Sequence, residues 1–172
     1  MKIFEYIHSK RRARLLGKMA AIPHKKQLPN LDDVHSIGIV LPHESTADEL
    51  RILQFFNNHM AKRDIVVTYY RHPAVGDKEN LTRTGLPTPT YLSTFVSHTY
   101  DIIIAATPAS DDNTLHAVLS TPARLRVAYD DTSMLLTPLT AQTYDIFIRG
   151  TGPCDLTNYL REILLLLTNI KK

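Results

Sequence analysis

The chain has 172 residues, of which 44% are apolar and 22% are charged, with one cysteine, no tryptophan and a formal net charge of +3. This length predicts one domain with its own buried core, and the apolar fraction excludes a disordered chain. A single cysteine excludes an internal disulfide framework and a multi-cysteine zinc site. The longest apolar runs, such as 163–167, fall far short of the roughly 20 residues that span a bilayer, so no transmembrane segment is expected.

Positive charge is concentrated at the start of the chain. Residues 1–30 carry eight Lys or Arg side chains and one acidic side chain, Glu5, which gives a net charge of +7. Because the whole chain carries +3, residues 31–172 carry −4. We therefore divide the chain into a basic N-terminal helix with its connector (1–30) and an α/β domain (31–172). Lys18 interrupts the apolar stretch that a secretory signal would need, whereas a transit peptide stays open because the segment is Arg-rich and acid-poor.

The predicted elements alternate between helices and strands. Apolar residues at near-helical spacing predict the helices, and short apolar runs rich in β-branched and aromatic residues predict the strands. Residues 71–89 are polar, contain several Pro and Gly residues, and predict a long loop that is either a lid or a variable surface segment. The expected elements are helices at 2–20, 47–62, 90–98, 111–120 and 155–170 and strands at 36–41, 64–70, 100–106, 125–129 and 144–148.

Helix ends and apolar faces are also predicted. Ser45 or Thr46 is expected to cap the helix at 47–62, and Ser110 with Asp111 the helix at 111–120. The expected inward faces are Leu50, Leu53, Phe56 and Met60 in one helix and Leu156, Tyr159, Leu160, Ile163, Leu164, Leu167 and Ile170 in the last helix.

Strands that are apolar runs and alternate with helices predict a parallel sheet covered on both faces. The expected fold class is α/β, with a single doubly wound, mostly parallel sheet of about five strands, Rossmann-like or flavodoxin-like. The phrase Thr-Tyr-Asp-Ile-x-Ile occurs at 99–104 and at 143–148. Because the residues between show no further self-similarity, we interpret it as the entry into a central parallel strand and not as a repeat.

Polar residues follow the predicted strands, at the edge where ligands bind in such sheets. Two pairs of aspartates could hold Mg²⁺ there. The structural reading is favoured, because Asp111 and Asp112 suit the first turn of a helix and Asp130 with Asp131 suits an ordinary turn. The candidate ligand edge consists of His43, Arg71, Asp111, Asp112, Asp130, Asp131 and Arg149.

Sequence motifs for catalysis are weak. Gly150-Thr151-Gly152 precedes a helix as a phosphate cradle would, but Pro153 removes an amide and no longer phosphate-binding motif is present, so a tight turn is favoured. Cys154 is expected to be structural, and the histidines have no metal-ligand spacing. We therefore predict no catalytic residue, metal or cofactor, and lean away from an enzyme.

The basic helix is the stronger functional signal. Its candidate binding residues are Lys10, Arg11, Arg12, Arg14 and Lys18. Cations in such a row predict salt-sensitive binding to RNA, a ribonucleoprotein or another acidic partner. A solvated helix whose apolar side packs on the domain, and a helix on an anionic membrane surface, are the open alternatives. The alternative function is a small nucleotide-binding or transferase-like enzyme that works at the ligand edge.

The order of elements resembles a known group. A basic helix, the strand at 36–40, the strand at 100–104, the phrase Ala-Arg-Leu-Arg-Val-Ala-Tyr at 123–129 and a Leu-rich last helix together resemble an uncharacterised family of small α/β proteins from Bacteroidetes-type bacteria. The resemblance implies a bacterial, cytoplasmic setting and no particular activity. The phrase at 123–129 is also similar, at fold level, to a strand entry in heptosyltransferase-like glycosyltransferases, which need two Rossmann-like domains where this chain has the length for one.

Overall fold

A computed structural model describes residues 2–24, 29, 31–131, 137–150 and 155–169 of the chain. The five strands within these residues form one sheet in which every neighbouring pair is parallel. This is the α/β fold that the sequence predicts. In chain order the elements are α1 (Lys2–Ala20), the short 3₁₀ turn η1 (Leu31–Asp33), β1 (Ser36–Leu41), α2 (Ala47–Ala61), β2 (Val66–Arg71), α3 (Pro89–Val96), β3 (Tyr100–Ala105), α4 (Asp112–Ser120), β4 (Ala123–Asp131), α5 (Pro138–Thr143), β5 (Ile146–Gly150) and α6 (Leu156–Asn169).

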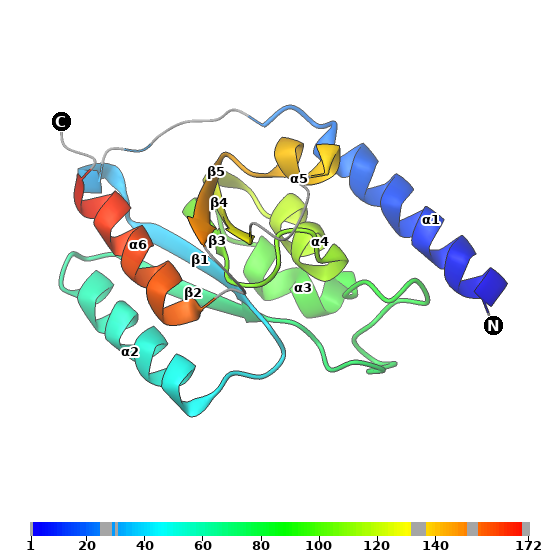
Figure 1. The fold of residues 1–172 in the computed structure, drawn as a ribbon, viewed down its shortest axis with the longest axis horizontal. Helices are drawn as coiled ribbons and strands as arrows, with labels where there is room; N and C mark the ends of the chain where they lie inside the picture. Colours follow the sequence, from blue (N-terminus) through cyan, green and yellow to red (C-terminus); the bar gives the residue numbers. More distant parts are fainter. Residues whose placement is uncertain (1, 25–28, 30, 132–136, 151–154, 170–172) are drawn as a thin grey trace.

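The strand order is β2–β1–β3–β4–β5, which is the flavodoxin-like arrangement of the two that the sequence leaves open. The order reverses between β1 and β3, so the crevice where such folds bind ligands lies beyond the carboxyl ends of these two strands. Helices α2 and α6 cover one face of the sheet, while α3, α4 and α5 lie on the other (Figure 1).

Each face of the sheet has an apolar core of its own. Alternate strand side chains pack against Phe56 of α2 and Tyr159 of α6 on one face, and against Phe95 of α3 and Leu115 of α4 on the other. Gly38 of β1 leaves space for the Phe95 ring, because a Cβ at this position would lie 2.9 Å from it. The layers therefore hold the sheet rigidly, and the residues at its carboxyl edge with it.

Most predicted helix ends and faces are confirmed. Thr46 caps α2 and forms a capping box with Glu49, and Asp111 caps α4 by accepting the backbone N–H of Thr114. The expected inward face of α6 is buried or packed on the core up to Leu167, while Ile170 lies outside the described residues. Leu50 is wrongly predicted to be in the core: it lies at the edge of the α2 stripe and is 50% exposed.

Two other predictions differ from the structure. The turn expected at Asp130 and Asp131 is wrong, because β4 continues through both residues and pairs with Arg149 and Gly150 of β5. Helix α5 is missing from the sequence prediction, since its six residues show no apolar periodicity. Its start is marked by Thr137, which caps the helix, and by proline at the first position.

The repeated phrase has a structural role at the amino edge of the sheet. Asp101 of β3 accepts the backbone N–H groups of His35 and Ser36 at 2.8 and 3.1 Å and pairs with Arg124 of β4 at 3.1 Å. In the second copy, Asp145 accepts the backbone N–H of Arg126 at 2.8 Å. Asp101 therefore binds the beginning of β1, whereas Asp145 binds the fourth residue of β4. The expected entry into a central strand holds for β3 alone, because β5 lies at the edge of the sheet.

Helix α1 packs on the domain through its second half and extends beyond it through its first half (Figure 1). Leu16 is fully buried within the core on the α4 side of the sheet, and α1 contacts both α4 and α5. Near the start of the helix, Phe4 and Tyr6 are 71% and 59% exposed. The helix is thus anchored through its second half, and residues 4–7 of its first half are exposed.

Candidate functional site

The side of α1 that faces the domain follows the helical repeat. Arg12 and Leu16 are one turn apart, and with His8 and Met19 they are less exposed than the residues around them. Arg12 contacts α4 directly, since its Nε lies 3.1 Å from the Oδ2 of Asp112. Burial raises the pKa of Asp112, an effect that the Arg12 guanidinium opposes. Arg12 therefore belongs to the packed side of the helix.

The opposite side of α1 is basic. Lys10, Arg14 and Lys18 follow one another at intervals of four residues and are all exposed. Because a helix turns roughly 100° per residue, Arg14 at the centre of this row points about 200° away from Arg12. Arg11 is also exposed and flanks the row. We call Lys10, Arg11, Arg14 and Lys18 the basic face of α1.

The basic face contains a hollow of about 420 Å³ lined by Lys10, Arg11 and Arg14 together with Ile7. The ammonium group of Lys10 also lies over the ring of Tyr6, 4.5 Å from its centre, which steadies both side chains. Of the five cations singled out from the sequence, four are exposed and lie on this face, and Arg12 lies on the packed side.

At the carboxyl edge, the ends of β1 and β2 are joined by polar contacts. Arg71 donates to the hydroxyl of Ser45 at 2.9 Å and to the carbonyl of Pro42 at 3.5 Å. The Nδ1 of His43 lies 3.2 Å from the carbonyl oxygen of His72. The predicted ligand residues His43 and Arg71 therefore support the loop after β1.

A second polar cluster connects β2 and β3 to α4 around the hydroxyl of Thr114. This hydroxyl donates to Asp111 at 2.9 Å, lies 3.2 Å from the Nε2 of His72, and also contacts the hydroxyl of Thr107. Burial lowers the pKa of His72, although Asp111 opposes the shift from 3.7 Å away. His72, Thr107 and Thr114 are buried, Asp111 is partly exposed, and each hydroxyl has a partner, as in a structural network.

The other predicted edge residues do not join these clusters. Asp130 is buried and pairs across the strands with Arg149, whose side chain is 77% exposed, at 3.5 Å. Asp112 pairs with α1 as described above. The side chain of Asp131, the turn at 151–152 and Cys154 lie outside the described residues. No group of three or more His, Cys, Asp or Glu side chains in the described part of the chain is arranged to hold a metal ion.

The long loop between β2 and α3 has a fixed course over the carboxyl edge. Asp77 forms a turn with the backbone N–H groups of Glu79 and Asn80, and Leu81 pairs with Pro87 in an antiparallel bridge. Gly85 lies close to α1: a Cβ there would be 3.3 Å from the Nη1 of Arg12, and the residue has a φ of +81° that disfavours any side chain.

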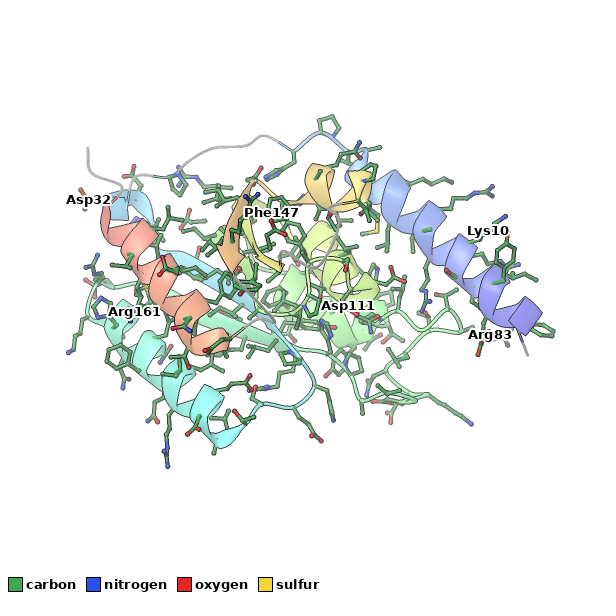
Figure 2. All side chains as sticks on the ribbon, viewed as in Figure 1. Lys10, Asp32, Arg83, Asp111, Phe147 and Arg161 are labelled. Atoms are coloured by element: carbon green, nitrogen blue, oxygen red, sulfur yellow. The ribbon has the colours of Figure 1, made fainter. Side chains whose placement is uncertain are left out.

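A cavity of about 630 Å³ lies between this loop, α1 and the first turn of α4. Sequence patterns did not identify it, because a loop course cannot be predicted from periodicity. The only local signal was the presence of Lys78 and Arg83 between Gly76 and Gly85. Figure 2 shows Arg83 on the opposite side of α1 from Lys10. The residues that line the cavity are Arg12, Pro73, Val75, Gly76, Asp77, Lys78, Leu81, Thr82, Arg83, Gly85 and Asn113.

No model of a known protein family matches the chain, and a comparison with curated proteins found no match. The expected resemblances to the Bacteroidetes-type family and to heptosyltransferase-like glycosyltransferases therefore stay predictions. Within the described residues, no helix has both the length and the apolar character needed to cross a membrane.

Proposed function

We propose that this protein is a binding protein in which the basic face of α1 engages RNA and the α/β domain holds the helix in place. The observation that carries the proposal is the position of Lys10, Arg11, Arg14 and Lys18 opposite the packed side of the helix. A helix anchored by Leu16 keeps these cations in one row facing solvent. Such a row can follow the phosphates of a nucleic-acid strand.

The absence of ion pairs on these cations within the described residues supports electrostatic binding. None of Lys10, Arg11, Arg14 and Lys18 forms an ion pair with a residue that the structure describes. Each can therefore neutralise a phosphate and release its counterion, at a slope of about −0.7 in log affinity against log salt for each contact with a single strand. Four contacts predict a loss of affinity of about 50-fold when the salt concentration rises fourfold.

The free end of α1 also presents aromatic groups beside the cations. Phe4 and Tyr6 are mostly exposed, and Tyr6 is held under Lys10. Exposed aromatic rings next to a basic groove are the surfaces on which unpaired bases stack. This combination favours single-stranded RNA over an acidic protein, whose side chains offer no base to stack.

The experiment measures binding of the full chain to a fluorescein-labelled single-stranded RNA of about 20 nucleotides by anisotropy. The test variant is K10Q/R11Q/R14Q, and the matched control is R51Q/K62Q/R161Q, which removes three exposed cations from α2, its end and α6. Figure 2 shows Arg161 far from α1. We expect the test variant to lose at least about tenfold in affinity at low salt while the control keeps that of the unmodified chain.

Equal losses in both variants would overturn the proposal, because the net charge of the protein and not the basic face would then determine binding. Binding to a labelled polyglutamate peptide tests the alternative that the partner is an acidic protein. Stronger binding of this peptide than of RNA would assign the basic face to an acidic protein.

A further inference from the structure

The cavity beside α1 differs from the basic face in position and shape. Its volume of about 630 Å³ lies within the range of small-molecule sites. Three separate parts of the chain form its walls, namely the loop after β2, Arg12 of α1 and Asn113 of α4. The loop is fixed by the Asp77 turn and the pairing of Leu81 with Pro87, so the walls are formed before any ligand arrives.

The lining of the cavity is positively charged. Arg12, Lys78 and Arg83 contribute three cations, and Asp77 contributes the single carboxylate. Both oxygens of Asp77 are already used within the loop, where they accept the backbone N–H groups at 79 and 80 and the side-chain amide of Asn80. The amide of Asn80 is the main cause that lowers the pKa of Asp77. The lining thus carries two excess positive charges.

These cations have capacity for an incoming anion. Neither Lys78 nor Arg83 forms an ion pair with any residue in the described part of the chain. Arg12 pairs with Asp112 through Nε, and its Nη1 lies next to Gly85 on the cavity wall. Guanidinium and ammonium groups that line one hollow are suited to phosphate, which accepts several charge-assisted hydrogen bonds at once.

Part of the remaining lining is apolar, while Thr82 and Asn113 add polar groups. Pro73, Val75 and Leu81 form part of the wall, and Gly76 with Gly85 leaves backbone accessible beside them. A ring or aliphatic portion of a ligand would cover this surface. We propose that the cavity binds a small phosphorylated molecule that carries a ring, with Arg12, Lys78 and Arg83 at its phosphate and the apolar wall against its ring. This inference does not rest on the RNA-binding function.

The test titrates the full ¹⁵N-labelled chain with AMP, inorganic phosphate and adenosine and follows the amide signals of Gly76 and Gly85. The variant is K78Q/R83Q, whose two side chains are exposed and make no described contact that holds the fold. The control is K62Q/R161Q. We expect AMP to shift both glycine signals and to bind more tightly than inorganic phosphate. The K78Q/R83Q variant should lose at least about tenfold in AMP affinity, and the control should lose none.

Absence of shifts at Gly76 and Gly85 at millimolar AMP would overturn the inference. Equal AMP affinity in K78Q/R83Q and in the unmodified chain would overturn it too, as would adenosine binding as tightly as AMP. The K10Q/R11Q/R14Q variant separates the two proposals, since it should lose RNA and keep AMP. Loss of AMP binding in this variant would show that the anion binds to the basic face and not in the cavity.

Discussion

The carboxylate of Asp101 should contribute about 3 kcal/mol to the free energy of unfolding, and D101A tests this. It accepts two backbone N–H groups, those of His35 and Ser36, and the hydroxyl of Ser36 at 3.2 Å. None of these three hydrogen bonds is fully buried, so each contributes about 1 kcal/mol, and the pair with Arg124, whose side chain is 32% exposed, adds less than about 1 kcal/mol. These hydrogen bonds outweigh burial and lower the pKa of Asp101.

Urea unfolding followed by circular dichroism measures the loss. D101N keeps one oxygen for the backbone N–H groups of His35 and Ser36, which both donate to Oδ2, and removes the charge, so it should cost less than D101A. R124Q should cost under about 1 kcal/mol because it removes the ion pair alone. If D101A costs no more than R124Q, the carboxylate does not hold the start of β1 to β3.

Three further outcomes follow from the packing and the titration of buried groups. L16A should lower the free energy of unfolding by about 2–5 kcal/mol and L15A by less than about 0.5 kcal/mol in urea titrations, because Leu16 is buried and Leu15 is 44% exposed; equal losses would contradict the orientation of α1. Burial lowers the pKa of His72 and of His116, so the unfolded chain takes up protons first. The free energy of unfolding should therefore be at its full value at pH values above about 6.5, the pKa of histidine in the unfolded chain, and should decrease as the pH is lowered further. The decrease should be smaller in H116Q, and a free energy of unfolding that rises on acidification would contradict this. L50Q should change the melting temperature by no more than a few degrees, and a large drop would place Leu50 in the core after all.

The strands could be predicted because each is an apolar run of about the right length for a buried parallel strand. Helix α5 could not, since Leu139 is its one large apolar residue and the helix is short. The strand order β2–β1–β3–β4–β5 could not be predicted either, because strand adjacency depends on contacts between residues far apart in the chain. Leu50 could not be placed for a similar reason. Periodicity predicts which residues form the apolar face of α2, but the elements packed against the helix determine how much of that face is buried.

The candidate sites could likewise be predicted only in part. The spacing of Lys10, Arg14 and Lys18 places them on one side of a helix without any structure. The spacing does not show that Arg12 is on the other side and packed, because that depends on Asp112 of α4. The sequence also does not show that Lys78 and Arg83 line a cavity, because this depends on the course of the loop beside α1 and α4.

The most direct test of the central claim is the salt dependence of RNA binding by the full chain and by K10Q/R11Q/R14Q. We expect a slope in log affinity against log salt of about −3 for the full chain and about −1 for the variant, because three of four phosphate contacts are removed. Two parallel lines would contradict it, since the RNA would then bind without using the basic face of α1.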